Sequence, residues 1–488
     1  MTIRVLMALA LLGCKGKPAA VKEQRVADAR VAAGERWGGA IEIAGQVPLE
    51  FELMWMPGPA ATMAIPQQGL AATALVDVTA TGNAMTFTLQ PPGAAPAAYA
   101  RFAVERAADG TTARGTLKQN GAELPVRMRR LADGEVVGAA PVRPQEPKPP
   151  LPYDAREASY ASKDGTRLAG TLTVPRGGGP HPAVVLITGT GAQDRDESLA
   201  GHKPFLVLAD HLTRHGVAVL RVDDRGVGGS GGDTAATDLD GKVEDALAGV
   251  AWLRQQPDID GARVGLVGHS EGGVIAPMAA SRPDARIAFI VLLAGPGVTG
   301  AQVSLRQLEQ IMRVGGSDEA TIKAAVDGQR VLLAAQARTA DPVELRKAIE
   351  ARIDQLAQLA SPVERAQFTG DARTAMITNG LAGLASPASR SFSLTDPAPY
   401  LAKVRCPVLA LGGSLDLQVA ADENLAAIQA ALARGGNPDV TVATLPGLNH
   451  LFQPARRGLI DEYAQIETTF DPAALERVST WLTARAAR

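Results

Sequence analysis

From residue 168 onward, short apolar runs alternate with helix-like stretches, and this alternation is the strongest constraint on the fold. It predicts a mostly parallel sheet flanked by helices, because parallel strands must be joined by crossover segments. Reactive side chains are then expected at the carboxyl ends of the strands. The predicted strands cover residues 168–174, 183–188, 217–222, 264–268, 289–294, 408–411 and 440–445.

Residues 37–131 have a different pattern, in which short alternating segments are separated by turn dipeptides. The dipeptides at 82–83, 109–110 and 120–121 are Gly-Asn, Asp-Gly and Asn-Gly, which favour tight hairpins. We therefore expect a small antiparallel β domain over residues 24–137. It contains no histidine or cysteine, so the sequence predicts a structural role, with lipid or glycan binding left as the alternative.

A proline-rich segment marks the domain boundary. Six prolines fall within residues 141–152, and such a density predicts an extended, semi-rigid linker over residues 138–152. A chain of 488 residues is also too long for one compact core. The larger domain is expected to occupy residues 153–488.

The N-terminus has the pattern of an export signal. Arg4 precedes an apolar run over residues 5–12, which is too short to span a membrane, and Gly13-Cys14 follows. The pattern is typical of a bacterial lipoprotein signal peptide over residues 1–13, after which Cys14 would carry the lipid. We expect an exported, membrane-anchored lipoprotein on the periplasmic or cell-surface side. An ordinary secretory signal, or a start codon assigned too early, is the alternative.

A candidate nucleophile lies between a predicted strand and a helix. Residues 268–272 read GHSEG, following strand 264–268 and preceding a helix-like segment over 274–280. This is the context of a nucleophile elbow, in which a strained turn presents the hydroxyl of Ser270. A second Gly-x-Ser-x-Gly, around Ser230, lies in a glycine-rich stretch without that context, and we interpret it as a loop.

The order serine, acid, histidine that accompanies such an elbow provides a further test. His450 is the only one of the six histidines C-terminal to Ser270, and it follows the last predicted strand as a general base should. Asp416 follows strand 408–411 and is the expected acid, with Asp422 as the second choice. The backbone N–H groups of Glu271 and Thr190 are the expected oxyanion donors.

Several stretches together resemble a family of bacterial secreted α/β-hydrolase esterases with a small N-terminal β domain. They are LITGTGAQDRDE (186–197), GHKPF (201–205), RVDDRGVG (221–228), GHSEGG (268–273) and LNHLFQ (448–453). The resemblance implies carboxylesterase activity on short acyl chains and assigns Ser270, Asp416 and His450 as its triad. The sequence departs from the family at Ala192, where proline is common, and at residues 414–415 of the acid loop.

An insertion at about 300–395 is rich in Ala, Leu, Gln, Glu and Arg, which predicts several helices. In the α/β-hydrolase fold that the resemblance implies, we expect it to form a helical cap that closes over the substrate and sets acyl-chain preference. A packing element away from the pocket is the alternative.

The function expected from the sequence is that of a serine carboxylesterase acting through an acyl-enzyme, without a cofactor or metal. The expected partner is a small-molecule ester. Charged residues make up 20% of the chain and the net charge is -2, so no basic field favours nucleic acid, and the lipid anchor is the only expected membrane contact. A peptidase or thioesterase with the same triad, or a lipid-anchored binding protein without activity, are the alternatives.

Overall fold

The computed structural model describes residues 34–486 with short gaps at 43–47, 59, 66–69, 91–98, 120–121, 133, 136, 138–142, 361–364 and 366–367. The signal peptide, Cys14, the turn at 120–121 and the start of the linker lie outside the described residues, so these stay predictions. The chain divides into two compact units. The β unit contains the described parts of 14–142 and of 353–379, and the mixed-sheet unit contains 143–352 and the described residues from 380 onward.

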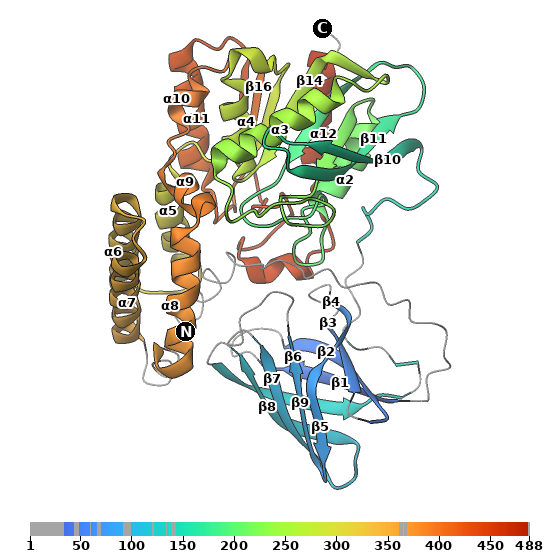
Figure 1. Ribbon diagram of the computed structural model, residues 1–488, viewed down its shortest axis with the longest axis vertical. Helices are drawn as coiled ribbons and strands as arrows, with labels where there is room; N and C mark the ends of the chain where they lie inside the picture. Colours follow the sequence, from blue (N-terminus) through green and yellow to red (C-terminus); the bar gives the residue numbers. More distant parts are fainter. Residues whose placement is uncertain are drawn as a thin grey trace. The chain divides into compact units, whose positions relative to one another are not determined.

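The β unit has a nine-stranded sheet in which every pairing is antiparallel, as the sequence predicts. The strand order is β4-β3-β2-β1-β9-β8-β7-β6-β5 (Figure 1). Along β7, every second side chain is buried, and Phe102 stacks on Phe87 of β6 with ring centroids 4.7 Å apart. The strands are β1 Glu35–Ile41, β2 Leu49–Met56, β3 Ala60–Ile65, β4 Leu70–Ala74, β5 Val76–Thr81, β6 Ala84–Leu89, β7 Ala100–Arg106, β8 Thr112–Gln119 and β9 Ala122–Arg130.

The second unit is built on an eight-stranded, mostly parallel sheet, which confirms the expected architecture. Its order is β10-β11-β13-β12-β14-β15-β16-β17, and β11 is antiparallel to both of its neighbours, whereas the pairs from β13 to β17 are parallel. The sequence did not predict the edge strand β10. The strands are β10 Tyr153–Ala161, β11 Arg167–Pro175, β12 His181–Ile187, β13 Ala218–Val222, β14 Ile259–His269, β15 Ile290–Leu293, β16 Val408–Gly413 and β17 Val440–Leu445.

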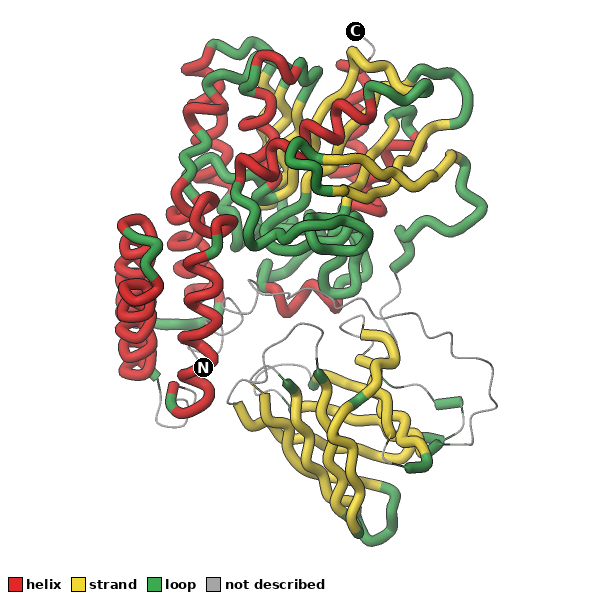
Figure 2. The backbone as a smooth tube through the Cα atoms, viewed as in Figure 1, coloured by secondary structure: helices red, strands yellow, loops and turns green. Residues whose placement is uncertain are grey.

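Helices cover both faces of this sheet, as Figure 2 shows with strands in yellow and helices in red. Alternate side chains of β12 enter two separate cores, because successive residues of a strand point to opposite faces. Val185 belongs to a core that also contains side chains of α3, α4 and α11, whereas Val184 belongs to a core that also contains side chains of α2 and α12. These helices are α2 Pro204–Arg214, α3 Leu239–Leu253, α4 Gly272–Ala280, α11 Ala421–Gly435 and α12 Pro472–Ala486.

The region between β15 and β16 is helical where described, as its composition predicts; its role as a cap stays a prediction. The Thr299 side chain accepts a hydrogen bond from Gln302 N–H and so caps the first helix, and Asp318 caps the second. The helices are α5 Gly300–Val314, α6 Glu319–Arg338, α7 Pro342–Leu359, α8 Gly370–Ala385, α9 Pro387–Leu394 and α10 Ala398–Leu401. Among the described residues, no helix combines the length and apolar character that crossing a bilayer requires.

Candidate active site

The elbow predicted at Ser270 is present as a sharp turn between β14 and α4. Ser270 has φ of +52°, a left-handed conformation that costs energy for a residue with a side chain. The flanking glycines permit the turn, since a Cβ at Gly268 would lie 2.0 Å from the Gly272 carbonyl oxygen, and a Cβ at Gly272 would lie 2.3 Å from the Ile187 oxygen. Ser270 is half-buried and sits at the carboxyl end of a central strand.

The structure joins Asp416 and His450. His450 Nδ1 lies 2.8 Å from Asp416 Oδ2, and both residues are buried. The other carboxylate oxygen, Oδ1, accepts hydrogen bonds from the N–H groups of Gln418 at 2.8 Å and Val419 at 2.9 Å. This fixes the carboxylate, which in turn leaves His450 Nε2 as the ring nitrogen that can act as a base. Asp422, the second choice from the sequence, lies in α11 with a side chain 73% exposed.

His450 is held beside the elbow by the residue that precedes Ser270. The His269 ring donates through Nε2 to the His450 carbonyl oxygen at 3.0 Å, and the two ring centroids are 4.8 Å apart. The loop after β12 also reaches the elbow, because a Cβ at Gly189 would lie 3.2 Å from Ser270 Cβ. Three loops from separate strands therefore meet around Ser270.

Both predicted oxyanion donors are available. Within the described residues, the backbone N–H groups of Thr190 and Glu271 have no hydrogen-bond acceptor. In contrast, the neighbouring Gly189 N–H donates to Glu197 Oε1 at 2.8 Å. Two unpaired donors next to a strained serine are the arrangement that stabilises negative charge developing on a carbonyl oxygen.

A buried ion pair that the sequence did not predict links the three loops. Glu197 Oε1 lies 2.8 Å from His269 Nδ1 and accepts the Gly189 N–H as well. Burial by itself would lower the pKa of His269, but the Glu197 carboxylate raises it above the ordinary histidine value. Because the partners of both ring nitrogens are acceptors, His269 is held as a cation that ties Glu197 to His450. Its place next to Ser270 was the only signal in the sequence.

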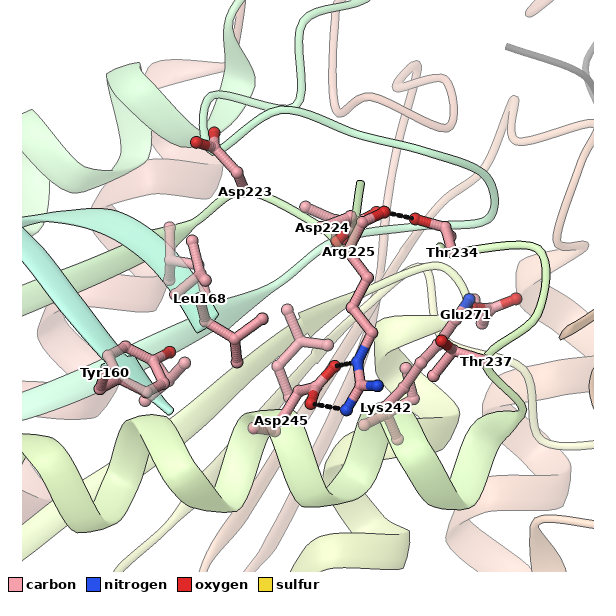
Figure 3. A pocket seen from close by; sticks show the side chains of 17 residues that line it. Tyr160, Leu168, Asp223, Asp224, Arg225, Thr234, Thr237, Lys242, Asp245 and Glu271 are labelled. Carbon is pink, nitrogen blue, oxygen red and sulfur yellow. Dashed lines mark hydrogen bonds and ion pairs between the residues drawn. The ribbon is translucent and has the colours of Figure 1, made fainter. Parts of the chain in front are cut away.

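A second cluster of charged and polar side chains lies next to the residues that carry the oxyanion donors. It lines a cavity of about 60 Å³ (Figure 3). Lys242 of α3 forms an ion pair with Glu271, whose side chain is buried, whereas that of Lys242 is 14% exposed. Asp224 accepts hydrogen bonds from the Thr188 hydroxyl at 2.7 Å and the Gln193 N–H at 2.9 Å, one on each side of Thr190. Burial raises the pKa of Asp224 to about 7. Neither Ser270 nor His450 lines the cavity, so it belongs to the supporting core.

The charged loops around residues 193–196 and 223–225 brace one another. The Arg195 guanidinium donates two hydrogen bonds to Asp223, at 3.1 and 2.8 Å, and Asp223 also accepts the Gly229 N–H. The hydroxyl of Ser230 donates to the Asp223 carbonyl at 2.7 Å and accepts from Ala169 N–H at 2.9 Å. Ser230 is therefore a structural residue of this loop, which confirms that interpretation of the second motif.

Comparison with known proteins identifies the family. The model of the X-Pro dipeptidyl-peptidase (S15) family matches residues 164–446, more than half of the chain. The chain belongs to this S15 family. The matched residues include Ser270 and Asp416. His450 lies just beyond the match.

The curated relatives that match this chain include a named esterase and an uncharacterized protein. Esterase EstD of Thermotoga maritima is 32% identical over 202 residues, which are 41% of this chain and 48% of EstD. An uncharacterized protein of Mycobacterium tuberculosis is 34% identical over 133 residues, 27% of this chain and 43% of its own. This S15 chain thus spans less than half the length of these relatives. Among solved structures, the Pyrococcus furiosus esterase Pf2001 covers 68% of this chain and 93% of its own, at 16% identity and a TM-score of 0.41.

The Lys242–Glu271 pair leads to a prediction about stability. Lys242→Met is expected to lower the free energy of unfolding by about 3–5 kcal/mol, because it leaves the Glu271 carboxylate buried without its cation. The measurement is urea denaturation followed by far-UV circular dichroism, whose helical signal comes mainly from the mixed-sheet unit.

Two further variants make this test specific. Combining Lys242→Met with Glu271→Gln removes both charges and is expected to recover part of the loss. Lys163→Met removes a lysine whose side chain is 75% exposed and pairs with Glu244, and it should change stability by less than about 0.5 kcal/mol. Equal effects of Lys242→Met and Lys163→Met would contradict a supporting role for the buried pair.

Proposed function

We propose that this protein is a serine carboxylesterase that hydrolyses esters of short acyl chains through an acyl-enzyme on Ser270. The observation that carries the proposal is the meeting of a left-handed serine, the Asp416–His450 pair and two unpaired N–H groups around one point. Each part serves acyl transfer, and their combination has no evident structural purpose, since a strained serine is unfavourable for folding.

In the proposed reaction, His450 Nε2 accepts the proton of Ser270 as Oγ attacks the ester carbonyl carbon. The carbonyl oxygen becomes an oxyanion that accepts hydrogen bonds from the N–H groups of Glu271 and Thr190. Asp416 keeps His450 in the required tautomer and stabilises its cationic form. The His450 proton then passes to the leaving alcohol. Water attacks the acyl-enzyme by the same route and releases the carboxylic acid and Ser270.

Peptide hydrolysis is the second candidate, and the family match favours it specifically, because the S15 model carries the name of an X-Pro dipeptidyl-peptidase. The triad does not discriminate between the two reactions, since it activates Ser270 in the same way for an ester or an amide. Esterase EstD, in contrast, is 32% identical to this chain over the aligned residues and is named an esterase. Direct comparison of leaving groups is therefore required.

The test compares three substrate classes on the full chain: p-nitrophenyl esters from acetyl to palmitoyl, an acyl thioester, and an Xaa-Pro p-nitroanilide. We expect the highest kcat/KM on the acetyl and butyryl esters, with a decline as the acyl chain lengthens. Faster cleavage of the Xaa-Pro anilide would favour the peptidase, and a preference for the thioester would favour a thioesterase.

Labelling identifies the nucleophile independently of the substrate. A fluorophosphonate is expected to modify one serine per chain, and peptide mapping should place the label on Ser270. Ser230 provides an internal control in the same protein, because it lies in a similar motif but its hydroxyl is used in the loop. The absence of any label, together with no hydrolysis, would revive the non-catalytic binding protein.

A further inference from the structure

Two histidines and a glutamate gather on the surface of the mixed-sheet unit, on the helices that cover one face of the sheet. His211 lies in the last turn of α2, His215 follows one turn later, and Glu476 projects from α12. One ligand atom from each residue lies within 4.8 Å of the other two. We propose that His211, His215 and Glu476 form a binding site for a divalent transition-metal ion of the Zn²⁺ type.

The distances suit a metal ion. Glu476 Oε2 is 3.9 Å from the Nε2 atom of His211 and also 3.9 Å from that of His215. A tetrahedral Zn²⁺ with bonds of about 2.0–2.2 Å holds its ligand atoms roughly 3.4 Å apart. The Glu476 oxygen therefore needs to approach each imidazole by about 0.5 Å, and the ligand nitrogens of the two histidines lie within 4.8 Å of each other. The Glu476 side chain is 62% exposed, which leaves it free to make this adjustment.

The donor atoms fit the same class of ion. Two imidazoles and one carboxylate are a typical ligand set for Zn²⁺ in proteins, with water completing the coordination. The spacing of four residues brings His211 and His215 onto one side of the helix end, where their ring centroids are 4.3 Å apart. Surface clusters made only of carboxylates lack imidazole nitrogen ligands and therefore select harder metal ions.

The hydrogen bonds leave the imidazoles in a suitable state. His215 Nδ1 donates to the His211 carbonyl oxygen at 2.7 Å, so its lone pair is on Nε2, the atom near Glu476. The Ser479 hydroxyl oxygen lies 3.0 Å from His211 Nε2. Its hydrogen can point to the Glu476 carbonyl oxygen, 3.1 Å away, rather than to the lone pair of His211 Nε2.

The site is separate from the candidate active site. His215 lies three residues before β13, which runs parallel to β14 through their shared neighbour β12. Ser270 follows the carboxyl end of β14, whereas the histidines lie near the amino end of β13. Because these strands are parallel, the two sites lie at opposite ends of the strands. A bound ion would join α2 to α12, which come from distant parts of the sequence and meet only in the folded chain. Metal binding is therefore expected to stabilise the fold.

The proposal is tested on the full chain prepared without a polyhistidine tag. Titration with Zn²⁺ in a calorimeter is expected to show one ion per chain, and His215→Ala should weaken its affinity at least about tenfold. Co²⁺ is expected to give the intense visible absorption of a four-coordinate site in the wild type but not in the variant. Zn²⁺ should also raise the Tm of the wild type more than that of His215→Ala.

The matched control is Glu423→Gln, which removes one exposed carboxylate from α11, whereas Glu476→Gln removes one from the cluster. Only the second change is expected to weaken Zn²⁺ binding. Equal affinities of the wild type and His215→Ala, or no binding by the wild type at 100 µM Zn²⁺, would overturn the proposal. Comparing Tm values without metal separates a loss of ligand from a loss of fold.

Discussion

Ser270→Ala is expected to lower kcat/KM for p-nitrophenyl acetate by about 10⁴-fold or more, without loss of the folded state. Removing the hydroxyl removes the covalent step, and the oxyanion donors and the pocket alone retain only a small part of the rate acceleration. Alanine has no functional group to replace Oγ, and it occupies less volume than serine, so no contact around the elbow has to shift. The measurement is steady-state hydrolysis, with far-UV circular dichroism as a check on folding.

Ser230→Ala is the matched control for this prediction. Its hydroxyl bonds the Asp223 carbonyl and Ala169 N–H, so the change is expected to cost about 1–3 kcal/mol of stability while kcat/KM stays within a few-fold. Both variants remove one oxygen from a Gly-x-Ser-x-Gly motif. A rate that survives in Ser270→Ala would reject Ser270 as the nucleophile, and a loss of rate in both variants would point to general damage to the loops.

The sheet could be predicted because its strands are buried on both faces. β12 and β16 consist almost entirely of buried apolar residues, a pattern that a sequence shows directly. Strand β10 was missed because it is an edge strand with mainly exposed side chains, and only Tyr153 and Ala158 are buried along it. A strand whose side chains are mostly exposed needs no regular pattern of apolar residues, so the sequence does not reveal it.

The proposed catalytic groups could be located from order alone, since Ser270, Asp416 and His450 each follow a predicted strand. Their supporting charges could not. Lys242 lies within a helix that shows no unusual pattern, and Glu197 is one of several acidic residues in its loop. Both acquire their roles from residues that are distant in sequence and meet only after folding. A pairing of this kind depends on tertiary geometry, which local patterns do not encode.

The second large effect is expected for Asp416→Asn, which should lower kcat/KM by about 10⁴-fold. The structure determines how the new amide would be oriented. Asp416 Oδ1 accepts the N–H groups of Gln418 and Val419, so the amide oxygen is expected to keep that position. The amide nitrogen would then face His450 Nδ1 and donate to it. This places the ring hydrogen on Nε2, where His450 can no longer accept the proton of Ser270.

Asp422→Asn is the control that separates the two candidate acids. Its side chain is exposed and pairs with Arg306 at 3.7 Å, so its loss is expected to leave kcat/KM within about twofold. Fluorophosphonate labelling of Ser270 should slow in Asp416→Asn along with hydrolysis, because both reactions need the same base. If Asp422→Asn lost activity and Asp416→Asn kept it, the acid would be Asp422. If neither changed the rate, His450 would act without a carboxylate partner, and the 2.8 Å contact with Asp416 would be structural.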